Sequence, residues 1–157
     1  MRRQVTIAHW AHIIGNAAPQ MKRVAVLAMR DVAKVLVARV VQEIVVRGLP
    51  DTLALQNSVR WRATDGGGTV IVDAPHAPFI EHGTRPHRPP LQPLQEWAMR
   101  KLGATEQEAR GIAWAIADKQ AMYGTPPHHF FASAMAGSRE LARAAVTKAL
   151  KTKLRLR

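Results

Sequence analysis

The stretch SVRWRATDGGGTVIVDA, residues 58–74, decides the fold class, because it predicts strands in a chain whose other patterns favour helices. Its first half alternates apolar and polar positions, which is the period of a strand with one apolar face. A flexible turn at residues 65–68 and an apolar return at residues 69–72 complete a β-hairpin. The apolar positions of the first strand are Val59, Trp61 and Ala63. A two-stranded hairpin is marginally stable alone, so we expect another strand, from this chain or from a neighbouring subunit.

A long helix is predicted before the hairpin, from Ala17 to Arg47. Apolar residues recur every four positions and should form one buried stripe along this helix. The stripe consists of Val24, Ala28, Val32, Leu36, Val40 and Ile44. Asn16 can cap the start of the helix, and Gly48 can end it.

The hairpin is followed by HAPFIEHGTRPHRPP, residues 76–90, whose prolines fix φ and bias the residues before them towards extended geometry. We therefore expect no helix here, but a sharp turn at Gly83 and Thr84 and then a rigid extended arm. Phe79 and Ile80 are expected to anchor the start of the arm in the core, and Glu81 to form a hydrogen bond locally or across a subunit boundary. Such an arm keeps its shape before it docks, which lowers the ordering cost of binding.

Three further helices are predicted, at about residues 93–102, 105–122 and 132–150. Thr105 and Glu108 form a capping-box pattern at the start of the second one. The positions expected to face inward on that helix are Ala109, Ile112, Ala113, Ile116 and Met122.

The organisation that follows is one α+β domain, residues 1–157. It has a long N-terminal helix, an antiparallel hairpin or small sheet, a proline-rich extended arm and C-terminal helices. Residues 85–123 form a helical insertion, and residues 151–157 form a flexible basic tail. One short echo is present, because the Gly-Thr-x-Pro of residues 83–86 returns at residues 124–127.

The formal net charge of +12 is unevenly distributed along the 157 residues. Residues 1–50 and 101–157 each carry +6, whereas residues 51–100 are neutral. Such a field attracts polyanions without implying specific recognition, and it equally suits solubility or an acidic protein partner. The candidate contacts to a DNA channel or another polyanion are Arg60, Arg62, Lys148, Lys151, Lys153, Arg155 and Arg157.

The residue types of the histidine-rich segment are compatible with two kinds of chemistry, metal binding and catalysis. His76, Glu81, His82 and His87 could supply ligands, but the spacing matches no established zinc pattern. The adjacent His128 and His129 could join them, although adjacent histidines rarely point at one ion. Glu81 beside His82 could act as a base and Thr84 as a nucleophile, but nothing in the sequence orients them. We therefore predict no catalytic residue, no metal and no cofactor. Charged residues also interrupt every long apolar run, so no membrane partner is expected.

Two short motifs and the order of the elements resemble the tail-completion, or neck, proteins of long-tailed bacteriophages. The first motif is the apolar strand of residues 70–72 followed by the Glu-x-Gly-Thr segment of residues 76–84. The second is the proline-aromatic run of residues 126–131, which leads into a C-terminal helix. The family usually has Tyr where His76 stands, and it often joins the two motifs without the intervening residues 85–123.

The resemblance implies a structural virion protein without catalysis, at the head–tail junction and in the host cytoplasm during assembly. Such a protein forms a homo-oligomeric ring around the DNA channel. It joins portal or head-closure proteins to tail terminator or tail tube proteins. The expected subunit or partner interface comprises Phe79, Glu81, Gly83, Thr84, Arg85, Pro86, Pro126, Pro127 and Phe130. The alternative function is a basic nucleic-acid-binding module.

Overall fold

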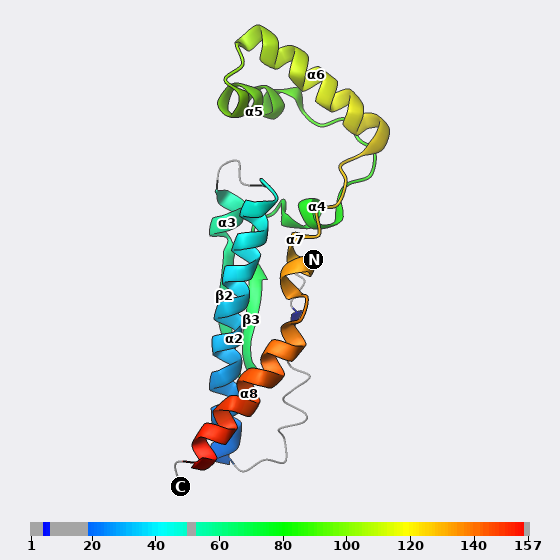
Figure 1. Ribbon diagram of the computed structural model, residues 1–157. Coiled ribbons are helices and arrows are strands. Elements are labelled where there is room, and N and C mark those ends of the chain that lie inside the picture. The colour runs from blue at the N-terminus through cyan, green and yellow to red at the C-terminus, as the bar shows by residue number, and fades with distance from the viewer. Residues whose placement is uncertain (1–4, 7–18, 50–52, 156–157) are drawn as a thin grey trace.

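The computed structural model describes residues 5–6, 19–49 and 53–155, and it has the predicted α+β architecture (Figure 1). The elements in chain order are β1 (Val5–Thr6), α2 (Pro19–Val46), α3 (Ala54–Asn57), β2 (Val59–Thr64), β3 (Gly67–Val72), α4 (Ala77–His82), α5 (Leu91–Leu102), α6 (Glu106–Tyr123), α7 (Phe130–Met135) and α8 (Ser138–Arg155).

The long helix α2 forms because its apolar residues share one face, as predicted. Five of the six stripe positions are buried, and Val24 at the N-terminal end is partly buried. The helix ends where Gly48 adopts a left-handed conformation with φ 64°. The N–H of Gly48 then donates to the carbonyl of Val45, and that of Leu49 to Ile44, which satisfies carbonyls of the last turn.

The hairpin pairs Val59 with Val72 and Trp61 with Val70 in an antiparallel register. The expected further strand is β1, which pairs with β3 on its other side, so the order in the sheet is β1-β3-β2. The turn is shorter than predicted, because Gly67 and Gly68 already belong to β3. A Cβ on either glycine would overlap the side chain of Met29 or Ala33 in α2, so the strand needs glycine where α2 crosses it.

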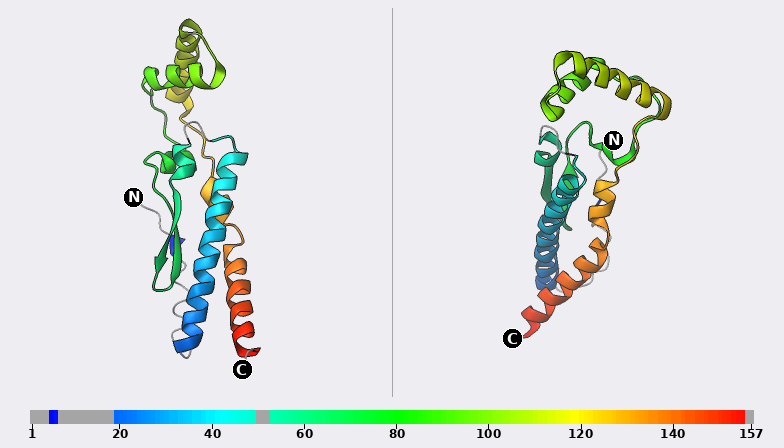
Figure 2. Two further views of the ribbon diagram at one scale, coloured as in Figure 1. Left: turned by 90° about the vertical axis from the view of Figure 1, so that its left-hand side faces the viewer. Right: turned by 45° about the horizontal axis from the view of Figure 1, so that its top comes forward.

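The body of the molecule has three layers, with α2 between the sheet and the pair α7 and α8 (Figure 2). The core lies along α2, and its largest fully buried side chains are Phe130, Met29, Leu36, Ile44 and Val40. Ala63 is exposed, so the predicted apolar face of β2 does not extend to its end.

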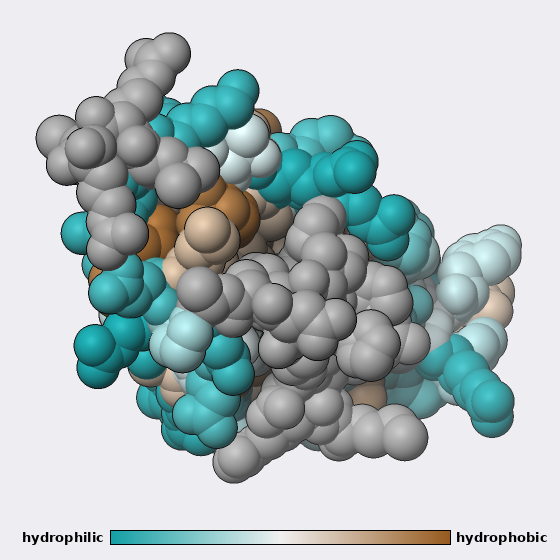
Figure 3. All heavy atoms as spheres, turned by 90° about the horizontal axis from the view of Figure 1, so that it is seen from below, coloured by the Kyte–Doolittle hydropathy of each residue, from teal (hydrophilic) through white to brown (hydrophobic). Residues whose placement is uncertain are grey.

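The C-terminal region contains two helices, so the prediction of one helix over residues 132–150 is wrong. α7 begins two residues earlier and is interrupted after Met135, where Gly137 adopts φ 69°. α8 then runs beside α2 to Arg155, so residues 151–155 continue a helix and do not form a separate tail. Seen from this end, the visible described surface is mainly hydrophilic, with a small hydrophobic area (Figure 3).

The predicted helices of residues 85–123 pack mainly on each other and form a lobe, called the α5–α6 lobe below, beyond the body (Figure 1). The capping box is confirmed, because the Thr105 hydroxyl accepts from the Glu108 N–H and the Glu108 carboxylate accepts from the Thr105 N–H. α5 begins at Leu91, and Met122 is exposed instead of inward.

Residues 77–82 form the helix α4, so the prediction that the prolines exclude a helix here is wrong. Pro78 lies within the first turn of α4. The N–H groups of the first turn have no acceptor inside a helix, so a proline there removes no hydrogen bond. Only the residues after Gly83 follow the expected extended path.

Candidate partner interface

Glu81 connects α4 to the first turn of α7. One carboxylate oxygen accepts a hydrogen bond from the N–H of Phe131 at 2.8 Å, and the other accepts from that of Ala132 at 3.0 Å. N–H groups at a helix start lack acceptors within the helix and carry partial positive charge, so a carboxylate is stabilised there. Glu81 is 8% exposed, and its partners belong to its own chain. The expected hydrogen bond is therefore formed within the subunit.

The glycine–threonine pairs of the two echoed segments cross directly. The Thr84 N–H donates to the Thr125 carbonyl, and the Thr125 N–H donates to the Thr84 hydroxyl, both at 3.0 Å. Gly83 and Gly124 adopt positive φ, and a Cβ on either would overlap the backbone of the opposite segment. The chain thus leaves the body and returns to it through one closely packed crossing, called the Gly-Thr crossing below.

Arg47, the residue after α2, forms hydrogen bonds with the segment that follows Pro126 and Pro127 and with α7. Its guanidinium donates to the carbonyl of His128 at 2.7 Å and to the hydroxyl of Ser133 at 2.8 Å. It also pairs with Glu43 at 2.9 Å. Three acceptors in different directions suit the planar fork of arginine. Sequence reasoning missed this residue, because nothing in the pattern relates it to residues more than eighty positions away.

The predicted interface residues divide into exposed and buried groups. Arg85, Pro86, Pro126 and Pro127 are exposed, while Gly83 and Thr84 are partly buried in the Gly-Thr crossing.

Two aromatic residues are placed differently from the predictions. Phe79 is 59% exposed, so it does not anchor the segment in the core. Phe130 is 1% exposed and lies in the core of its own chain, so it is not available to a partner. The exposure of Phe79 agrees with its place in the predicted interface, and its neighbour Ile80 packs against the core instead. Phe130 is buried because α7 packs against α2.

His76, His82 and His87 lie just before, within and after α4. Nδ1 of His87 lies 3.0 Å from the Arg85 carbonyl, and His76 precedes α4 without capping it. Within the described residues, no three histidine or acidic side chains come close enough to hold a metal ion. The prediction that they bind no metal stays a prediction, which removal of metal by a chelator would test.

The basic candidates lie on two separate surfaces. Arg60 forms an ion pair with Asp73, and Arg62 is exposed on the same strand. Lys148, Lys151 and Lys153 are exposed on α8. Arg155 is the last residue of α8, and Arg157 lies outside the described residues.

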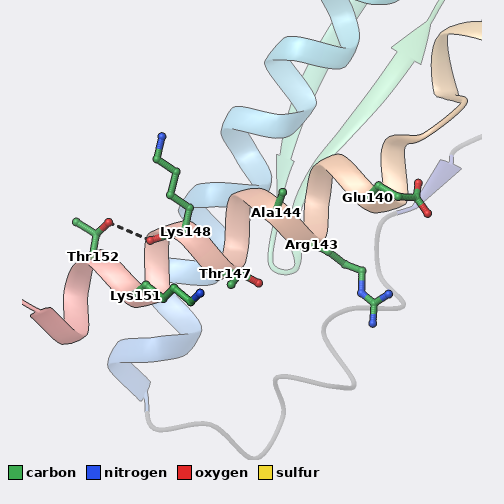
Figure 4. A pocket seen from close by; sticks show the side chains of 7 residues that line it. All are labelled: Glu140, Arg143, Ala144, Thr147, Lys148, Lys151 and Thr152. Carbon is green, nitrogen blue, oxygen red and sulfur yellow. Dashed lines mark hydrogen bonds between the residues drawn. The ribbon is translucent and has the colours of Figure 1, made fainter.

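A shallow open hollow runs along α8 (Figure 4). The residues that line it are Glu140, Arg143, Ala144, Thr147, Lys148, Lys151 and Thr152. It is a groove on one helix and offers no enclosed volume for a small molecule. The sequence-based prediction found its lysines but not Arg143.

The α5–α6 lobe carries exposed apolar side chains that the sequence-based prediction did not assign to an interface. They are Met99, Leu102, Trp114, Met122 and Tyr123. Arg88 lies over the Trp114 ring, 5.2 Å from its centroid, and pairs with Asp118, so it fixes the extended segment against α6. Phe79 on α4 is a further exposed apolar residue, outside the lobe.

Comparisons with protein-family models, with curated proteins and with solved structures find no match to this chain. Within the described ranges, none of the helices combines the length and apolarity required to cross a membrane.

Proposed function

We propose that this protein is a structural virion protein of the phage neck, which assembles as a ring around the DNA channel and joins the head to the tail. The observation that carries this proposal is the α5–α6 lobe, held away from the body and rich in exposed apolar side chains (Figure 1). The motifs of residues 76–84 and 126–131 support it through their resemblance to neck proteins. The proposed role needs no catalysis.

The exposure of the lobe favours a protein partner. Leu102 and Met122 are 57% and 64% exposed, and Tyr123 is 74% exposed. Large apolar side chains left exposed on a folded protein are candidates for contact with another protein. A ring built from head-to-tail contacts would cover such a surface with the next subunit, and it closes without leaving a free end.

The connection of the lobe also favours docking. The Gly-Thr crossing and the Arg88–Asp118 pair tie the two linking segments to each other and to α6. A lobe fixed in this way loses little conformational entropy when it binds, so more of the contact energy appears as affinity. The proposed contacts beyond the ring are portal or head-closure proteins on one side and tail terminator or tail tube proteins on the other.

A double substitution tests the lobe as the assembly surface. Leu102→Gln/Met122→Gln replaces two exposed apolar side chains of the lobe with polar ones. Glutamine has a high helix propensity, so both helices should be retained. Leu27→Gln/Val46→Gln is the matched control, because both residues are exposed on α2. Masses of the purified proteins should be measured alone and with the portal and tail terminator proteins of the same phage. Joined heads and tails should be counted after complementation.

The proposal expects a ring-sized assembly for the parent protein and the control, and its loss in the lobe variant. A protein that stays monomeric in every mixture would overturn the ring. Equal loss in both double variants would overturn the lobe as its interface. A monomer that binds DNA in a salt-sensitive manner and joins no heads to tails would instead support the nucleic-acid-binding module.

A further inference from the structure

The start of α2 and the end of α8 lie side by side at one end of the body (Figures 1 and 2), and both helix ends carry cationic residues. α8 carries six basic residues and one acidic residue, whereas α5 and α6 together carry four of each. Positive charge is therefore concentrated away from the α5–α6 lobe. The exposed cations of this basic end are Lys22, Arg23, Lys148, Lys151 and Lys153.

These five cations have no carboxylate partner among the described residues. The ion pairs found there involve Lys34, Arg47, Arg60 and Arg88 instead. Like charges held close together repel one another, and this repulsion is relieved when a polyanion binds.

A favourable interaction with the helix dipole explains only some of these cations. Lysines near the end of α8 interact favourably with the negative end of the helix dipole. Lys22 and Arg23 lie near the start of α2, where the dipole is positive and cations are unfavourable, and the first turn of α2 has no acidic residue. Their position therefore points to an anion outside the chain.

The shape of the surface suits an extended ligand. Ala144 and Thr147 are small and lie in the hollow along α8, while Arg143 and Lys151 extend on one side of the helix and Lys148 on another (Figure 4). Residues 143 to 151 rise about 12 Å along a helix axis. This length is comparable with about three steps of a DNA strand, at about 3.4 Å a step.

We propose that the basic end binds the phosphate backbone of duplex DNA without sequence preference. The inference rests on the proposed function, which supplies DNA as the polyanion, and it identifies the part of the subunit that faces the DNA. α2 and α8 contain no Phe, Trp or Tyr, so they offer no surface on which unpaired bases stack. Lysine ammonium groups bind phosphates as point charges, a contact that carries no sequence information.

The test compares two double variants of the full chain that each remove two exposed cations from a helix. Lys148→Gln/Lys151→Gln changes the basic end, and Arg110→Gln/Lys119→Gln changes α6 on the lobe. Binding to a fluorescent 30-base-pair duplex of random sequence (a length of about 100 Å) is measured by anisotropy over a salt series. Thermal melting checks that each variant is folded.

The proposal expects the basic-end variant to bind at least about tenfold more weakly at 0.1 M salt. The slope of log affinity against log salt should fall by about 1.8, which corresponds to two lost phosphate contacts. The lobe variant should stay within about twofold of the parent. Equal weakening in both variants would show an effect of net charge alone and would overturn the proposal.

Two further outcomes also decide against it. Absence of DNA binding at low salt would overturn this inference while leaving ring assembly, and hence the proposed function, intact. Poly-glutamate that competes as strongly as DNA of equal charge would point to an acidic protein partner. Binding through the basic end by a protein that never forms rings would support this inference and overturn the proposed function.

Discussion

Thr84 and Thr125 form an isolated antiparallel bridge although they are 41 positions apart in the sequence. Each threonine follows a glycine, and the backbone around each threonine packs against the glycine that precedes the other. The sequence echo of Gly-Thr-x-Pro is therefore a structural pair. This pair joins the two segments that connect the α5–α6 lobe to the body.

Substitution of Gly83 by alanine should destabilise the protein more than the same change at Gly103. Both residues have positive φ, 72° and 67°, but Gly103 has ψ 21°, a left-handed conformation that costs an L residue about 1–2 kcal/mol, whereas Gly83 has ψ −177°, a region that is essentially confined to glycine. A Cβ at Gly103 meets open space, whereas one at Gly83 overlaps the Thr125 carbonyl. We expect a loss of about 1–2 kcal/mol for Gly103→Ala and about 2–4 kcal/mol for Gly83→Ala, measured by urea unfolding. Equal losses would show that the crossing is not closely packed.

Removal of the charge on Glu81 should also destabilise the body. Its two oxygens accept from two different N–H groups, whereas glutamine has one acceptor oxygen and would turn an NH₂ group towards an N–H. Glu81→Gln should therefore lower the free energy of unfolding by about 1–3 kcal/mol. Glu96→Gln on the exposed side of α5 is the control and should change it by less than about 0.5 kcal/mol. An unchanged unfolding midpoint for Glu81→Gln would contradict this role.

Local patterns predicted most of the fold. The four-residue spacing in α2, the alternation in β2 and the Thr105–Glu108 box each depend on neighbours in the sequence, and each appears in the structure. The wrong predictions concern residues whose local preference is compatible with two different structures. A proline excludes the interior of a helix but is accepted in its first turn, so Pro78 permits α4. Gly137, in contrast, divides a helix that the apolar pattern alone would continue.

The candidate site was harder to predict because its contacts are long-range. The sequence singled out Glu81 and the Gly-Thr segment, but it contained no signal for the acceptors of Arg47 or the N–H groups that bind Glu81. Burial also depends on tertiary packing, which is why Phe79 does not anchor the core and Phe130 is not available to a partner. The sequence also could not predict that Lys22 lies at the same end of the body as the lysines of α8, because this depends on the relative direction of two helices.

Arg47 should be energetically coupled to Ser133. Lysine keeps the charge but cannot reach three acceptors at once, so Arg47→Lys should cost about 1–2 kcal/mol. Ser133→Ala should cost less in the Arg47→Lys background than alone, with a coupling of about 0.5–1 kcal/mol in a double-mutant cycle of urea unfolding. Arg62→Lys, exposed on β2, is the control for a general effect of the exchange. Additive losses would show that the guanidinium does not hold α7 through this hydroxyl.

The capping box of α6 should be visible in the titration of Glu108. The hydrogen bonds from the Thr105 hydroxyl (2.7 Å) and then from its N–H (2.8 Å) lower the pKa of the Glu108 carboxyl from its ordinary value of 4.5. A pKa that is lower in the folded state stabilises the fold above the unfolded value, and this contribution is lost as the pH falls through the folded value. Thr105→Ala removes the larger cause, so the pKa should rise towards 4.5 in a carboxyl NMR titration. Thr147→Ala, on the exposed face of α8, should leave the Glu108 titration unchanged. A Glu108 pKa that does not rise in Thr105→Ala would show that the hydroxyl is not bonded to the carboxylate in solution.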